Sequence, residues 1–158
     1  MPASERIAIL KKTVVFMERA VDVWSNGIAT AGIKTISQAR KEVHLTLKTL
    51  QLSVEEASRI SGATLPFHAV PRSKDRFECE LKFSIGIVVA IAPFNNPLNL
   101  LCHKLGSAIA TENPVIFKRS DETPLVVITF REILYDSGLP KEMWSILTGT
   151  LEYFGSRH

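Results

Sequence analysis

Hydrophobic residues recur at helical spacing along the first sixty positions, in two successive runs. The first run starts after Ser4, a residue type that often caps helix N-termini, and stops at the Asn-Gly pair of positions 26–27. The second run begins at Ile36 and closes at the Ser-Gly pair of positions 61–62, with Glu42 among the charged residues of its polar face. The pattern predicts two long amphipathic helices.

The pattern changes after residue 65. Pro66, Pro71 and the Arg-Ser-Lys-Asp cluster at 72–75 predict an exposed turn. Apolar and polar residues then alternate from Phe77 to Phe83, which is the period of a half-buried strand. We therefore divide the chain into three parts: a helical segment 1–65, a connecting strand segment 66–84 and a partial dinucleotide-binding βαβαβ unit 85–158.

The third part begins with residues 85–92, which are apolar throughout and rich in β-branched residues, as in a parallel strand covered on both faces. Two prolines and two asparagines at 93–97 end this strand, and helical spacing resumes over 98–110. The order repeats with a strand at 115–117, a helix from Pro124 and a strand at 144–148. The alternation predicts an α/β fold, with N-terminal helices followed by a partial Rossmann-like parallel sheet.

Composition narrows the classes of function. The chain has 158 residues, of which 46% are hydrophobic and 22% charged, as in one globular domain or a piece of a larger fold. Its apolar runs are too short to cross a bilayer, and a formal net charge of +3 forms no basic stripe. We expect neither a membrane nor a nucleic acid as partner.

The cysteines and histidines predict no metal site, because their spacing matches no common ligand set. Cys79 and Cys102 lack CxxC spacing, and the N-terminus carries no secretory signal, so we expect reduced thiols in a cytoplasmic protein. Cys102 directly precedes His103, which suggests a nucleophile with its base. Adjacent residues on a helix point in different directions, however, and cannot form such a pair. A buried structural thiol is therefore favoured over a nucleophile.

Polar residues follow the predicted parallel strands, where open α/β sheets bind their ligands. The amide of Asn95 could donate to an oxyanion, or could satisfy local loop backbone. Lys118 could reach a ribose hydroxyl or a phosphate. Asp121 could accept hydrogen bonds from the two hydroxyls of a ribose, or could cap the next helix.

The ordered motifs of this part closely resemble the aldehyde dehydrogenase superfamily. They are the run 86–97 (GIVVAIAPFNNP), then 113–120 (NPVIFKRS), 123–125 (TPL), 137–140 (SGLP) and 147–149 (LTG). The resemblance implies that Asn95 is catalytic, as the amide that holds the oxygen of the thiohemiacetal. It also implies NAD or NADP as cofactor, with these binding residues: Ile91, Ala92, Pro93, Phe94, Lys118, Ser120, Asp121 and Gly149. Asp121 favours NAD by repelling a 2′-phosphate, whereas Arg119 favours NADP.

The chain also departs from the family pattern. Glu112 stands where the family has a glycine before asparagine, a position at which positive φ costs a non-glycine residue about 1 kcal/mol. Leu151 replaces the second glycine of the cofactor turn, which predicts weakened or lost cofactor binding. The family's nucleophilic cysteine and general base have no counterpart in the 158 residues.

We therefore predict a fragment of an NAD(P)-dependent aldehyde dehydrogenase that is inactive alone, with an aldehyde as the substrate of the full-length family. The alternative is a non-catalytic oligomerisation or interaction module derived from that fold. Its partner would be a second copy or a complementing chain, paired through the exposed sheet edge and the strand at 77–83.

Overall fold

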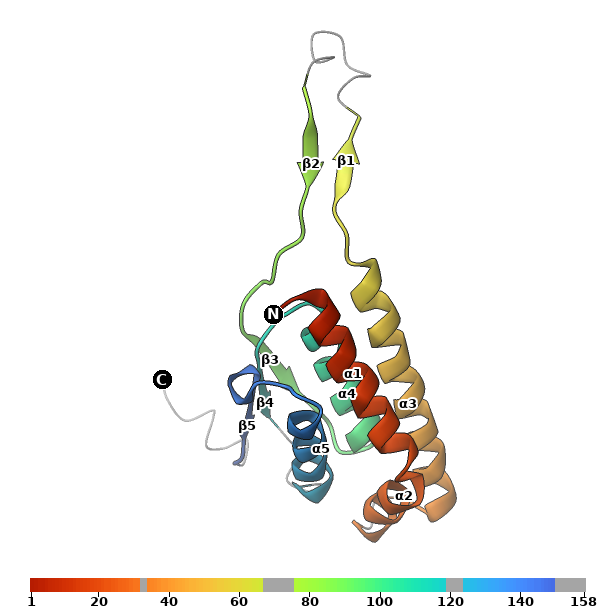
Figure 1. The fold of residues 1–158 in the computed structure, drawn as a ribbon. Coiled ribbons are helices and arrows are strands. Elements are labelled where there is room, and N and C mark those ends of the chain that lie inside the picture. The colour runs from red at the N-terminus through yellow and green to blue at the C-terminus, as the bar shows by residue number, and fades with distance from the viewer. Residues whose placement is uncertain (32–33, 67–75, 119–123, 150–158) are drawn as a thin grey trace.

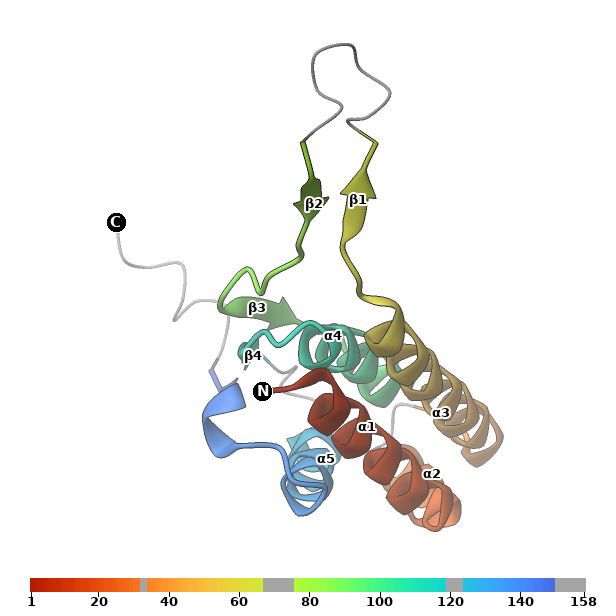
Figure 2. The same cartoon turned by 45° about the horizontal axis from the view of Figure 1, so that its top comes forward.

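A computed structural model describes residues 1–31, 34–66, 76–118 and 124–149. Five helices pack beside a three-stranded parallel sheet, and a two-stranded hairpin projects away from both (Figures 1 and 2). The predicted α/β class, with helices first and a parallel sheet after them, is confirmed. In the described residues, no helix is both long and apolar enough to span a membrane.

The first predicted helix is in fact two, α1 (Ala3–Glu18) and α2 (Val21–Thr30). The chain turns at Ala20, whose φ of −125° and ψ of 22° are not helical, and its N–H donates to the carbonyl of Met17 at 3.1 Å. The buried residues Met17, Trp24 and Ile28 keep helical spacing across the turn, so the hydrophobic pattern did not show the break. The predicted stop at 26–27 was also wrong, since α2 continues to Thr30.

The second predicted helix is α3 (Ile36–Arg59), and it lies against α1, α2 and α4. Its N-terminus is a capping box. Thr35 Oγ1 accepts a hydrogen bond from the N–H of Gln38, whose side chain in turn accepts one from the N–H of Thr35. Ala39, Val43 and Leu50 are buried along one stripe of the helix.

The sheet has the order β3 (Val88–Ile91), β4 (Val115–Lys118) and β5 (Trp144–Leu147), all parallel. The crossovers are α4 (Pro97–Ala110) and α5 (Pro124–Asp136), and a short 3-10 helix, η2 (Lys141–Met143), precedes β5. This is the βαβαβ order that the sequence predicts.

Only one face of the sheet is covered by the residues that the structure describes. On the face toward α4 and α5, Phe117 and Trp144 are buried, and their rings meet edge to face with centroids 6.3 Å apart. On the opposite face Val89 and Ile91 are each 64% exposed. The predicted burial of this strand on both faces is therefore wrong for these residues, because no layer from the described part of the chain covers their second face.

The hairpin consists of β1 (Ala63–Leu65) and β2 (Glu78–Glu80), paired antiparallel (Figure 1). A strand was predicted here, but its half-buried character was wrong, since Phe77 is 79% and Phe83 80% exposed. The cause is that, among the described residues, β2 pairs with β1 alone and no layer covers either face of the hairpin. Gly62 lies at the base of this hairpin, where any Cβ would overlap the carbonyl oxygen of Glu80.

Glu112, in the turn between α4 and β4, has the expected positive φ, at 62°. Its carboxylate is held by the N-terminal amine of Met1 and by Arg6, whose Nη1 lies 3.1 Å from Oε2. Arg6 also donates through Nε to the carbonyl of Ala110 at 3.1 Å, at the end of α4. The strained turn is thus tied to the first turn of α1.

These contacts predict a pH dependence of stability. The hydrogen bond from the N-terminal amine, then the charges of that amine and of Arg6, lower the pKa of Glu112 below its ordinary value. A lowered folded pKa stabilises the fold above the unfolded pKa, and this gain is lost as pH falls through the folded value. Urea unfolding from pH 7 to pH 3 should show this loss in the parent chain and not in Glu112→Gln.

The matched control is Glu132→Gln, a change at an exposed carboxylate on α5. It should follow the pH profile of the parent chain. If the free energies of unfolding of the parent chain and of Glu112→Gln run parallel from pH 7 to pH 3, the contacts of the Glu112 carboxylate contribute no stability.

Candidate functional site

The carboxyl ends of the three parallel strands lie side by side. Ile91 is in register with Lys118, and Lys118 with Leu147. The segments that leave these strands therefore start from one edge of the sheet, which is where open α/β sheets place their ligands.

Asn95 lies in the segment that leaves β3. This segment is anchored at its start, because the N–H of the buried Ala92 donates to the carbonyl of Lys118 at 3.3 Å. Pro93 and Asn95 are exposed, and the ring of Phe94 is 52% exposed. Asn95 is therefore accessible to solvent in the segment that follows the sheet edge.

A buried carboxylate from another helix caps α4, directly after Asn95. The Glu42 side chain is 1% exposed, and its Oε1 accepts hydrogen bonds from the N–H groups of Leu98 at 3.0 Å and Asn99 at 3.1 Å. Its Oε2 lies 2.6 Å from Nζ of Lys34. The sequence places Glu42 on the polar face of its helix, and this was wrong: the side chain points toward α4 and is buried.

Lys118 and Gly149 complete the described part of this edge. Lys118 is half-buried at the end of β4, and Gly149 follows β5 by two residues. Gly149 has a φ of 141°, a backbone conformation that a side chain would strain. The other two predicted binding residues, Ser120 and Asp121, lie outside the described residues.

Comparison with known proteins identifies the family of the chain. Residues 1–157 match the model of the aldehyde dehydrogenase family. The chain belongs to the aldehyde dehydrogenase family. It is 39% identical over 145 residues to the 3-sulfolactaldehyde dehydrogenase of Priestia aryabhattai. This match covers 92% of the present chain and 30% of the relative. The chain is 32% identical over 156 residues to the lactaldehyde dehydrogenase of Methanococcus vannielii, with 96% and 32% covered.

Solved structures of the family have the same fold. Aldehyde dehydrogenase 21 from Physcomitrella patens, in complex with the reaction product succinate, superposes with a TM-score of 0.89 at 36% identity, covering 96% of this chain and 32% of that one. The NADP-dependent glyceraldehyde-3-phosphate dehydrogenase from Bacillus halodurans C-125, complexed with NADP, gives 0.90 at 28% identity, with 98% and 33% covered. The chain thus spans about a third of the length of these family members.

Neither cysteine of this aldehyde dehydrogenase family chain lies at the sheet edge. Cys102 is fully buried within α4, and burial, followed by the negative charge of Glu42, raises the pKa of its thiol. Cys79 is exposed on β2 of the hairpin. A thiol that stays protonated is a poor nucleophile, so Cys102 has the structural role that the sequence predicts.

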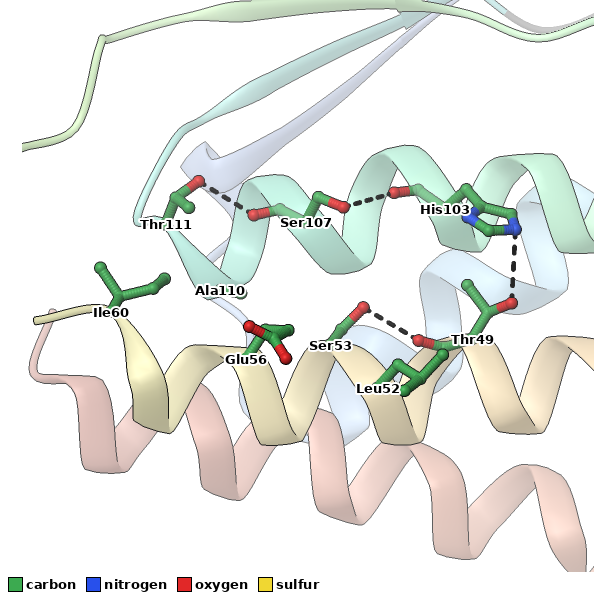
Figure 3. Close-up of a pocket in the computed structure, with 9 residues that line it drawn as sticks. All are labelled: Thr49, Leu52, Ser53, Glu56, Ile60, His103, Ser107, Ala110 and Thr111. Atoms are coloured by element: carbon green, nitrogen blue, oxygen red, sulfur yellow. Dashed lines mark hydrogen bonds between the residues drawn. The ribbon is translucent and has the colours of Figure 1, made fainter.

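A shallow groove of about 320 Å³ lies between α3 and α4 (Figure 3). The hydroxyls that line it already donate within the protein: Ser53 to the carbonyl of Thr49, Ser107 to that of His103 and Thr111 to that of Ser107. The hydroxyl of Thr49 donates to the carbonyl of Leu45 and to Oδ1 of Asn99. Each of these hydroxyls is therefore engaged by the protein itself. This groove lies along the C-terminal halves of both helices, away from Asn95. A separate finding concerns metals: in the described part of the chain, no cluster of His, Cys, Asp and Glu could hold a metal ion.

The two thiols should differ sharply in reactivity. In the native chain at pH 8, we expect an aromatic disulfide reagent to modify one cysteine, Cys79, and to reach Cys102 only after unfolding in urea. The released thiolate, measured by absorbance, should rise from about one to about two equivalents on unfolding. Cys79→Ser should release none in the native state, and rapid modification of this variant would contradict the burial of Cys102.

Proposed function

We propose that this chain supplies the oxyanion donor and one wall of the cofactor cleft of an NAD(P)-dependent aldehyde dehydrogenase. In the reaction proposed, a cysteine attacks the aldehyde, a hydride leaves the resulting adduct, and the thioester is then hydrolysed or phosphorolysed. The cofactor supplies the hydride acceptor. The observation that supports the proposal is that Ile91, Lys118 and Leu147 are in register, so the segments that carry Asn95 and Gly149 leave the same edge of the sheet.

The role of Asn95 follows from what its amide can do in this reaction. Attack on an aldehyde moves negative charge onto the carbonyl oxygen, and a fixed N–H donor lowers the energy of that charge in the transition state. Asn95 is exposed at the sheet edge and lies next to the capped end of α4. This accessibility supports oxyanion binding over a role in satisfying loop backbone.

The residues at the sheet edge fit a dinucleotide in part. Ile91 and Phe94 offer exposed apolar surface to a ring, and the Lys118 ammonium can donate to ribose hydroxyls. The first turn of α4 does not fit a pyrophosphate, because the N–H groups of Leu98 and Asn99 already bind Glu42. The relatives named for 3-sulfolactaldehyde and lactaldehyde support an aldehyde as the substrate class.

The nucleophile and the general base would come from polypeptide beyond these 158 residues. Cys102 is buried and Cys79 lies on the hairpin, so neither can attack a substrate bound beside Asn95. We therefore expect the 158-residue chain alone to bind cofactor weakly and to leave aldehyde unchanged.

Cofactor binding can be measured by ligand-observed NMR, which detects weak complexes. NAD⁺ or NADP⁺ should bind the parent chain, and Lys118→Ala should weaken binding about tenfold, or about 1.4 kcal/mol. Lys141→Ala, an exposed change at the opposite end of β5, should leave binding unchanged. Absence of binding by either cofactor, or equal effects of the two substitutions, would contradict the proposed cleft.

A second candidate function is an interaction module, favoured by the uncovered face of the sheet. The side chains of Ile87, Val89 and Ile91 are each more than 60% exposed along β3 and the residue before it, and natural proteins rarely leave such a patch bare. Another chain, either a second copy or a complementing polypeptide, would cover this face.

The exposed face should bind an environment-sensitive hydrophobic dye. We expect Val89→Glu to reduce dye fluorescence several-fold, because a charge at the centre of the patch disrupts its apolar surface. Val23→Glu, at a valine that is 71% exposed on α2, is the control and should have little effect. A monodisperse monomer in sedimentation that binds no dye would argue against this second function.

A further inference from the structure

The short segment that carries Asn95 is held between two anchors. On one side, Ala92 is bonded to β4 through the carbonyl of Lys118. On the other side, α4 begins at Pro97, and the N–H groups of Leu98 and Asn99 are bonded to Glu42. The position of Asn95 therefore depends on whatever fixes the start of α4.

The start of α4 is not fixed by its own N-cap residue. Asn96 occupies the N-cap position, but its side chain makes no capping hydrogen bond. First-turn N–H groups have no partner within their own helix, so without a cap they would be left to solvent. Glu42, from the second turn of α3, supplies the missing acceptor, and the negative charge is also favourable at the positive end of the helix dipole.

Lys34 joins this cap to the loop itself. Its ammonium donates to Oε2 of Glu42 at 2.6 Å and also to Oδ1 of Asn96, the residue directly after Asn95. The Lys34 side chain is 14% exposed and the Glu42 side chain 1%, so both charges are largely withdrawn from water and compensate each other. One ammonium thus couples the buried carboxylate to the Asn95 loop.

We infer that Glu42 and Lys34 are positioning residues for Asn95: together they set where its amide lies at the sheet edge. The inference rests on the proposed function for the role of Asn95 as oxyanion donor. Neither residue lies at the sheet edge itself, so each acts through the start of α4 and through Asn96. The two contacts separate their contributions, since Glu42 holds the helix and Lys34 holds the loop.

The test uses isotope-labelled parent chain and variants, with the signals of the Asn95 backbone and side-chain amide read by NMR. Lys34→Met should shift both signals and broaden or sharpen them as the loop loses its second anchor, and Lys34→Arg should restore the parent positions in large part. Glu42→Ala should do the same and also speed hydrogen exchange of the Leu98 and Asn99 amides at least tenfold. Glu42→Gln keeps an acceptor for these amides but loses the negative charge. It should therefore shift the Asn95 signals while changing the hydrogen exchange of Leu98 and Asn99 less than Glu42→Ala does.

Two controls on α3 separate positioning from general stability. Lys48→Met and Glu55→Gln replace exposed charges on the same helix and should leave the Asn95 signals in place. If Glu42→Ala fails to fold by circular dichroism, Lys34→Met and Glu42→Gln decide. Unchanged Asn95 signals in folded Lys34→Met and Glu42→Gln would overturn the inference and leave Glu42 as a helix cap only.

This result and the cofactor titration are independent. Movement of the Asn95 signals is measured without cofactor, so it supports the positioning of Asn95 even where NAD⁺ and NADP⁺ fail to bind. Conversely, cofactor binding that depends on Lys118, with Asn95 signals indifferent to Lys34 and Glu42, would keep the proposed function and reject the positioning residues.

Discussion

One buried carboxylate, that of Glu42, ties the N-terminal helices to the sheet unit through two hydrogen bonds to α4. Glu42 lies on α3, but its hydrogen bonds go to α4, so it links the helices to the crossover that follows the first parallel strand. Removing one partner of a buried ion pair typically costs about 3–5 kcal/mol, because the other charge is left without compensation. The pairing of α3 with α4 therefore rests on a specific polar contact as well as on apolar packing.

Helices α3 and α4 also approach each other closely at a second point. Gly106 of α4 lies against Ser53 of α3, and a Cβ on Gly106 would be 2.5 Å from the Ser53 hydroxyl oxygen. A small residue at this crossing lets the two helices approach closely, while Glu42 contacts the start of α4. Helix packing and the site at the sheet edge are thus parts of one arrangement, in which the position of Asn95 follows from contacts made by α3.

Much of the fold could be predicted because its signals are local. The apolar run at 85–92, the Pro-Asn loop after it and the strands predicted at 115–117 and 144–148 follow from residue type and spacing. The structure has these strands at 88–91, 115–118 and 144–147. The positive φ of Glu112 was expected for a different reason, because the family that the chain resembles has a glycine at this position. These features need no knowledge of distant residues.

The features that could not be predicted depend on what packs against what. The break at Ala20 leaves the spacing of buried residues intact, so periodicity could not detect it. The exposure of Phe77 and Phe83 is decided by the lack of a covering layer in the described residues, which an alternating pattern does not report. Glu42 reads as one more surface charge on a helix, and only the position of α4 shows that it is buried. Of the candidate site, the sequence could supply the residues at the strand ends, but not the cap that holds one of them.

This cap also bears on how a dinucleotide could bind. In common dinucleotide folds the helix after the first strand receives the pyrophosphate at its N-terminus, and a glycine-rich turn lets the backbone approach closely. Here the corresponding helix is α4, and the turn before it contains Pro93, Phe94, Asn95 and Asn96 instead of glycines. A phosphate at this position would have to displace a buried carboxylate from two N–H groups and from Lys34, and would approach a negative charge as it did so. On the proposed function, both the sequence of the turn and the contact with Glu42 would direct the phosphates of a dinucleotide away from α4, and the start of this helix would serve to position Asn95.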